Sequence, residues 1–211
     1  MFAPTRLKRR LTPVLLLFLI AVLAAGCGVF SPDESKNNGG GGTDPGVFKP
    51  ATSPDQCMAN FKNAWEQRTL VEYQKLLDDQ FQFFFDPNDG LEQFVGPSWG
   101  RTEELDSAKS IFEGAAGYDL IKKEDIPPVL SIEFTTFSKV FDWQDPGTDQ
   151  LYEGTVKARY KVGIKVSFQG VEQTTLVTGD NDFYVKGYPQ DDGTTLYKIK
   201  VWEDQGQNLG G

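Results

Sequence analysis

The chain has 211 residues, with 30 acidic and 21 basic side chains and a formal net charge of −9 at pH 7. This acidity, with no basic stripe to offset it, excludes nucleic acid as a partner. The absence of histidine excludes serine–histidine and cysteine–histidine catalytic pairs and the commonest ligand of zinc. Any catalysis would depend on carboxylates, tyrosines or lysines, and we predict neither a metal nor a cofactor.

Residues 1–26 have the order of a secretory signal: a basic head, an apolar run at 11–23 and small residues before Cys27. The ending Leu23-Ala24-Ala25-Gly26-Cys27 resembles the bacterial lipobox. That resemblance implies cleavage before Cys27 and lipidation of its sulfur. An uncleaved anchor or an ordinary signal peptide is the alternative. Residues 1–26 hold four of the basic and none of the acidic side chains, so the mature net charge is −13.

Residues 27–50 are predicted to be a flexible tether, because they combine low hydrophobicity with four consecutive glycines at 39–42. The tether would hold a folded domain at 51–207 away from the membrane. With Cys27 lipidated, Cys57 has no partner in the chain for a disulfide. Cys57 is then either a small buried apolar residue on a helix or a reactive thiol.

The domain begins with two short predicted helices between residues 53 and 77. Ser53-Pro54-Asp55-Gln56 has the residues of an N-cap, a first-turn proline and a capping box. A second helix start follows at Thr69, and apolar residues recur behind both starts at helical spacing. A third helix is predicted at 102–114.

The strands are predicted from short-range alternation. Residues 81–85 form a buried strand that ends at the turn cluster 86–90. From 152 to 168 the even positions are apolar and the odd positions mostly charged, which indicates a long antiparallel strand with one solvated face. Gln169-Gly170 is expected to be a tight turn into a partner strand at 171–186. Imperfect alternation at 129–143 and 196–202 suggests β-bulges.

Helices followed by a long curved antiparallel sheet make an α+β plan. Residues 61–68, 73–77 and 81–85 resemble the opening of the nuclear transport factor 2-like (ketosteroid isomerase-like, or cone) superfamily. Residues 197–204 resemble its last strand, in which an aromatic residue, an isoleucine and a tryptophan precede an aspartate. The resemblance implies about three helices packed on a curved sheet, with an apolar pocket at the wide end of the cone.

Four aromatic residues on the apolar faces of these elements are candidates to line that pocket: Trp65, Tyr73, Phe83 and Tyr160. No catalytic residue can be assigned, because the donor and base of the isomerases have no clear counterpart in the chain. The favoured hypothesis is a non-catalytic module that binds an apolar small molecule or an envelope protein. The alternatives are an acid–base enzyme that uses carboxylate and tyrosine groups, and a structural domain with a filled core.

Location follows from the lipobox resemblance. We expect a lipid-anchored protein of the bacterial cell envelope, on the periplasmic face of the outer membrane if the host is Gram-negative. The membrane would be engaged through lipidated Cys27. A homodimer is possible for a cone domain, although the charged face of the strand at 152–168 gives no sign of one.

Overall fold

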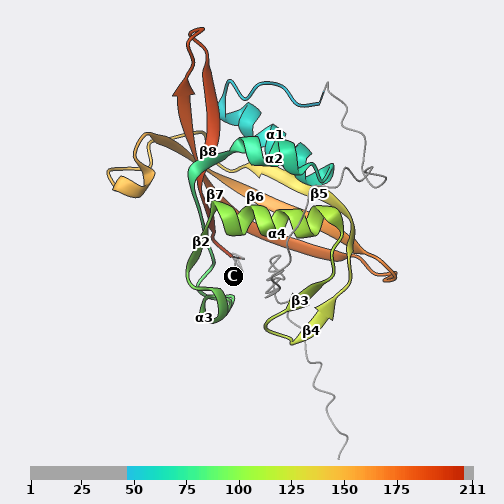
Figure 1. Ribbon diagram of the computed structural model, residues 1–211. Helices are drawn as coiled ribbons and strands as arrows, with labels where there is room; N and C mark the ends of the chain where they lie inside the picture. Colours follow the sequence, from blue (N-terminus) through green and yellow to red (C-terminus); the bar gives the residue numbers. More distant parts are fainter. Residues whose placement is uncertain (1–46, 207–211) are drawn as a thin grey trace, which may run out of the picture.

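The computed structural model describes residues 47–206. Helices and a curved sheet pack in two layers, as Figure 1 shows. The helices are α1 (Pro54–Glu66), α2 (Leu70–Leu76), α3 (Glu92–Val95), α4 (Arg101–Glu113) and the 3₁₀-helix η1 (Gln150–Tyr152). The strands are β1 (Leu77–Phe84), β2 (Ser98–Gly100), β3 (Gly117–Asp119), β4 (Glu124–Ile126), β5 (Val129–Lys139), β6 (Thr155–Phe168), β7 (Thr175–Pro189) and β8 (Thr195–Asp204). The predicted α+β class with helices on a curved sheet is confirmed.

The main sheet has six strands in the order β2-β1-β8-β7-β6-β5. The prediction of a wholly antiparallel sheet is wrong, because β1 and β8 pair in parallel while the other neighbours are antiparallel. The two parallel strands come from opposite ends of the domain. Since no hairpin joins them, local sequence does not determine their relative direction.

The predicted helices at 53–77 and 102–114 correspond to α1, α2 and α4. Ser53 Oγ accepts a hydrogen bond from the Gln56 backbone N–H (3.1 Å), and Pro54 occupies the first turn, as the sequence predicts. Gly114 ends α4 in the left-handed region at φ 69°, which a residue without Cβ adopts easily.

The long strand predicted at 152–168 begins later, at Thr155. Tyr152 belongs to η1, and Gly154 has a φ of 73° that interrupts the extended backbone. Gln169 and Gly170 do form a turn, in which the Val171 N–H donates to Phe168 O at 3.3 Å. The prediction that this turn alone joins the two strands is wrong, because β7 starts only at Thr175.

The predicted β-bulges are confirmed: the pairing of β5 with β6 shifts at two places, and that of β7 with β8 shifts at Tyr184/Val185. The sequence did not predict α3, β2 or the separate β3–β4 hairpin. The helix α3 has four residues, and each of these three strands has three. Segments this short have too few positions for a periodic pattern.

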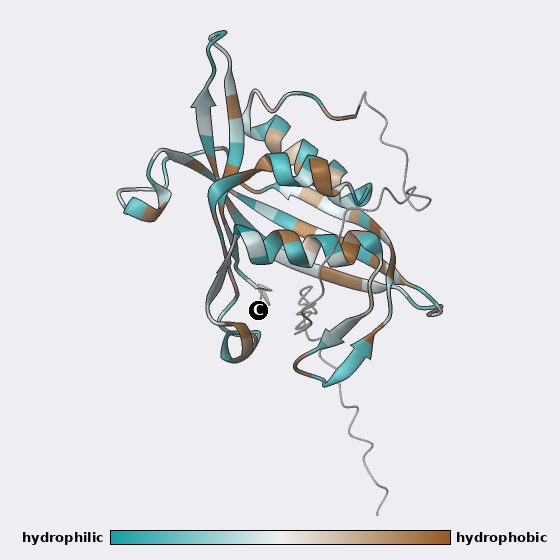
Figure 2. Cartoon of the chain, in the orientation of Figure 1, coloured by the Kyte–Doolittle hydropathy of each residue, from teal (hydrophilic) through white to brown (hydrophobic). Residues whose placement is uncertain are grey.

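The core lies between the helices and the concave face of the sheet, and it is rich in aromatic rings. Phe61 of α1 is central, since its ring lies within 6.4 Å of six other aromatic rings from α1, α2, β5, β7 and β8. Figure 2 shows the hydrophilic tip of the β7–β8 hairpin, which projects away from this core. Cys57 is fully buried in the core, and burial raises the pKa of its thiol to about 12, so its surroundings are those of an inert thiol.

Candidate functional site: an aromatic cavity with two buried carboxyls

A cavity of about 60 Å³ lies between the helices and the concave face of the sheet. Eight of its lining residues are aromatic, and the others are mainly aliphatic or small. The lining residues are Phe61, Trp65, Phe83, Phe85, Trp99, Glu104, Ser107, Phe134, Val162, Ile164, Val177, Thr178, Gly179, Asn181, Phe183, Trp202 and Asp204. They come from α1, α4 and all six strands of the main sheet, except Phe85, which follows β1 directly. The volume has room for about four or five non-hydrogen atoms.

Asp204, the last residue of β8, is the first of two buried carboxyls in the cavity wall and is only 5% exposed. The chain turns back at Gly206, whose backbone N–H donates to Asp204 Oδ1 at 2.9 Å. Asp204 Oδ2 is buried and receives no hydrogen bond from the part of the chain that the structure describes. Burial, reinforced by the nearby charges of Asp86 and Asp89, raises the pKa of Asp204 to about 7, although the Gly206 N–H opposes the shift.

Two further carboxyls near Asp204 belong to the loop after β1. Asp86 Oδ1 accepts hydrogen bonds from the Asn88 backbone and side chain (2.9 and 2.8 Å), and Asp89 Oδ1 accepts from the Leu91 N–H (2.7 Å). These bonds are typical of turn-forming aspartates. Burial and the neighbouring acids Asp86 and Glu92 raise the pKa of Asp89. Asp204 therefore faces a concentration of negative charge.

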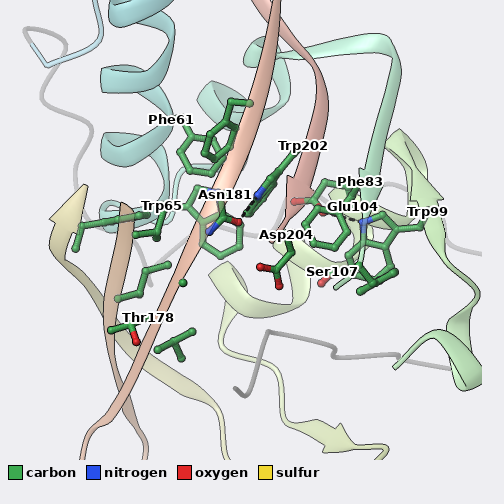
Figure 3. A pocket seen from close by; sticks show the side chains of 17 residues that line it. Phe61, Trp65, Phe83, Trp99, Glu104, Ser107, Thr178, Asn181, Trp202 and Asp204 are labelled. Carbon is green, nitrogen blue, oxygen red and sulfur yellow. Dashed lines mark hydrogen bonds between the residues drawn. The ribbon is translucent and has the colours of Figure 1, made fainter. Parts of the chain in front are cut away.

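Glu104 of α4 is the second buried carboxyl, at 3% exposed. The Tyr73 hydroxyl donates to Glu104 Oε1, and the Trp99 indole N–H donates to Glu104 Oε2 at 3.1 Å. Burial raises the pKa of Glu104 to about 7, even though both donors favour its ionised form. Both oxygens of Glu104 thus accept a hydrogen bond, whereas Asp204 Oδ2 accepts none from residues 47–206. Figure 3 shows Glu104 and Asp204 entering the same aromatic surroundings from α4 and β8.

Asn181, Ser107 and Thr178 complete the polar part of the wall. Asn181 Oδ1 accepts from the Trp202 indole N–H at 2.7 Å, drawn as a dashed line in Figure 3. This bond holds the Trp202 ring beside Phe183, at 5.3 Å between ring centroids. The amide N–H groups of Asn181 make no hydrogen bond to any residue among 47–206 and are available to a ligand.

The four residues named from the sequence divide between the cavity and the core. Trp65 and Phe83 line the cavity. Tyr73 is fully buried and is connected to the cavity through its hydrogen bond to Glu104. Tyr160 packs against Phe137, Trp143 and Phe183 and is not part of the lining. Cys27 lies outside the described residues.

Asp204 and Glu104 were not identified as site residues from the sequence, although a signal existed for each. Asp204 is two residues after Trp202, and alternate residues of a strand share a face. Glu104 precedes Ala108 and Ile111 by four and seven residues, which places it on the buried face of α4. A carboxylate on an apolar face is the kind of residue that marks a site.

No helix within residues 47–206 is long and apolar enough to cross a membrane. No group of three or more histidine, cysteine, aspartate or glutamate side chains in that range is arranged to hold a metal ion.

No family model matches the chain, and no curated protein matches it. Its fold is similar to that of solved structures. One is a conserved protein from Planctomyces limnophilus, 12% identical, covering 71% of this chain and 89% of that one with a TM-score of 0.46. Another is a nuclear transport factor 2-like protein of unknown function in nutrient uptake from Rhodospirillum rubrum, 10% identical, covering 74% and 98% with a TM-score of 0.44.

A third similar structure is a nuclear transport factor 2-like protein from Cytophaga hutchinsonii, 14% identical, covering 72% of this chain and 93% of that one with a TM-score of 0.40. Likenesses at this level of identity concern the fold.

Proposed function

We propose that this protein is a lipid-anchored binding protein of the bacterial envelope, whose cavity holds a small, largely apolar molecule. The observation that carries the proposal is the aromatic cavity with a few polar groups in its wall: Asp204, Glu104, Asn181, Ser107 and Thr178. Apolar walls with a small number of placed polar groups are typical of small-molecule sites. A structural domain would be expected to fill this space with its own side chains.

Binding is favoured over catalysis because the best proton donors of the site are already engaged. The Tyr73 hydroxyl and the Trp99 indole N–H both donate to Glu104. Burial and the charge of Glu104 raise the pKa of Tyr73 well above its ordinary value, so it holds its proton. Neither group is free to stabilise negative charge that develops on a substrate, as a preorganised oxyanion site requires.

An acid–base enzyme is the second candidate, and one observation favours it. Asp204 and Glu104 line one cavity, and burial raises the pKa of each to about 7, where a carboxyl can both accept and donate a proton. Asp204, with its unpartnered Oδ2 among the described residues, would be the base. Among the described lining residues, Asn181, Ser107 and Thr178 would then be the polar side chains left to donate a hydrogen bond to a substrate.

The location belongs to the same proposal. Cleavage before Cys27 and lipidation of its sulfur would anchor the chain, and the tether would separate the domain from the bilayer. Residues 47 and 49 within the segment assigned to the tether already lie against α1, since their backbone oxygens accept hydrogen bonds from Asn63 and Asn60 (3.5 and 2.7 Å). The free tether would therefore end before residue 47.

Native mass spectrometry of the full mature protein, extracted in mild detergent from the membranes of its own host, tests the proposal. A retained small molecule, released on denaturation, is the expected result. A matched preparation in which Ser107→Phe fills the cavity should retain none. Equal small-molecule occupancy in both preparations, or none in either, would contradict a binding role for this cavity.

A further inference from the structure

We propose that the ligand of this cavity is a small organic ammonium ion, with its nitrogen at the Asp204 carboxylate and its alkyl part against the aromatic rings. The inference rests on the proposed binding function and gives it a ligand class. It depends on three features of the wall: the sign of its charge, one unpartnered oxygen and the faces of its rings.

The charge of the wall is negative. Asp204 and Glu104 line the cavity, and none of the described lining residues is a lysine or an arginine. Asp86 and Asp89 add negative charge close enough to shift the pKa of Asp204. In such surroundings a cationic ligand is attracted and an anionic ligand is repelled, and low polarity strengthens both effects.

The unpartnered oxygen defines where the charge of the ligand would lie. Asp204 Oδ2 is buried and receives no hydrogen bond from residues 47–206, whereas Oδ1 accepts from Gly206. A buried carboxylate oxygen without a donor is costly. An ammonium group has up to three N–H donors and a full positive charge, so it would supply both the missing hydrogen bond and the missing counter-charge.

The rings suit the rest of such a ligand. Trp202 lies two residues before Asp204 on β8 and packs against Phe183 and Phe83, with ring centroids 5.3 and 4.9 Å apart. All three line the cavity. Aromatic faces attract cations, tryptophan most strongly, and they also bury alkyl groups. The room for about four or five heavy atoms limits the ligand to a short alkylammonium.

The competing ligand class is a neutral molecule held by protonated Asp204. The two classes respond to pH in opposite directions. An ammonium needs ionised Asp204, so its affinity rises as pH increases through about 7. A neutral hydrogen-bond acceptor needs the protonated form, so its affinity falls over the same range. Asp86, Asp89 and Glu104 are the other acidic groups around the site. Burial raises the pKa of Glu104 to about 7, so its ionisation over the same range also strengthens cation binding.

Three probes with the same branched four-carbon skeleton test the inference: isobutylammonium, isobutanol and isobutyrate. Isothermal titration of the full mature protein in detergent, at about pH 8, is expected to show isobutylammonium binding at least about tenfold more tightly than isobutanol, with isobutyrate weakest. Asp204→Asn keeps the side-chain shape and should reduce the affinity for isobutylammonium at least about tenfold, with that for isobutanol changed less than about twofold. Asp191→Asn removes the same charge from an exposed turn and should change neither.

Failure of the ligand class can be told apart from failure of the binding function. Isobutanol binding as tightly as isobutylammonium, or isobutyrate binding best, overturns the ammonium assignment and leaves a binding cavity. No binding of isobutylammonium also overturns the assignment, and the native mass spectrum then decides whether the cavity holds another molecule. Loss of isobutylammonium affinity in Asp191→Asn equal to that in Asp204→Asn would show a general charge effect and overturn the assignment to this site.

Discussion

The Asp204 carboxyl destabilises the folded chain when it is ionised. In the unfolded chain its carboxyl ionises at about pH 4, whereas burial and the neighbouring acids raise its pKa in the fold to about 7. Between these values the folded state holds a proton that the unfolded state has released. Stability therefore falls as pH rises through this window, since the folded state binds more protons than the unfolded state.

Asp204→Asn should remove the part of this pH dependence that Asp204 contributes. We expect the variant to be more stable than the parent by about 1–3 kcal/mol at about pH 8, and nearly equal to it at about pH 3, because the carboxyl of the parent is then mostly neutral in both states. Urea unfolding at several pH values measures the difference. A variant less stable than the parent at high pH would show that the Asp204 carboxylate is a stabilising group. Because burial also raises the pKa of Glu104, part of the fall in stability with rising pH is expected to remain in the variant.

The hydrogen bond from the Tyr73 hydroxyl to Glu104 is expected to stabilise the fold. Tyr73→Phe leaves Glu104 Oε1 buried without its donor, which should cost about 1–3 kcal/mol in the free energy of unfolding at about pH 8. The loss should be smaller at about pH 5, where folded Glu104 is protonated. Tyr73→Phe combined with Glu104→Gln should cost less than the sum of the two single changes, because both remove one interaction. Full additivity in urea unfolding would contradict the coupling.

Among the elements, the β5–β6 pair has an irregularity that depends on one small residue. The register shifts between Phe134 and Thr136, and Gly163 of β6 lies opposite. A Cβ at position 163 would lie 2.8 Å from Thr135 Oγ1 and 3.2 Å from Thr136 Cβ. The bulge places Phe134 in the cavity wall and Phe137 against Phe61, so Gly163 helps to shape the site.

Gly163→Ala should therefore destabilise the domain by about 1–3 kcal/mol through crowding at the bulge. Thr135→Ala in the same chain removes the nearest atom and should restore part of the loss, which thermal unfolding can measure. Thr135→Ala alone is the control. A Gly163→Ala variant as stable as the parent would mean that the threonines move aside without cost.

The elements that could be predicted from sequence are those with local signals. The N-cap at Ser53 and the alternation in β6 depend on residues close in sequence, and both are present. The parallel pairing of β1 with β8 and the short α3, β2 and β3–β4 lack such signals. Trp65 and Phe83 could be placed in the cavity from their apolar faces, whereas the same reasoning also selected Tyr160, which packs in the core.

The outer face of the sheet has a buried carboxylate whose charge is already neutralised by neighbouring cations. Buried Asp182 forms ion pairs with Lys157 (2.9 Å) and Arg159 (2.6 Å), and these cations lower its pKa despite the burial. Asp182 thus contrasts with Asp204, which has no cation among the residues lining its cavity. A buried carboxylate with its counter-charge in place is typical of an internal ion pair, whereas one without it is the kind of group that marks a candidate site.

Anchoring is a property of the full chain and gives the last prediction. Cys27→Ser removes the sulfur that would carry the lipid, so the protein should leave the membrane fraction or accumulate unprocessed, as fractionation of host cells with immunoblotting would show. Cys57→Ser, which alters the other cysteine within the core, should remain with the membrane. A cleaved Cys27→Ser protein that still fractionates with membrane would contradict the lipobox interpretation.

The α+β class, the main helices and the inward face of β6 follow from local patterns, because helical periodicity, capping residues and strand alternation involve residues close in sequence. Which acids meet depends on long-range packing. Glu104 and Asp204 are 100 positions apart in the sequence, and they share a cavity because β8 inserts between β1 and β7 while α4 packs against β1. Their burial, and hence their raised pKa values, exist only once those distant segments are assembled.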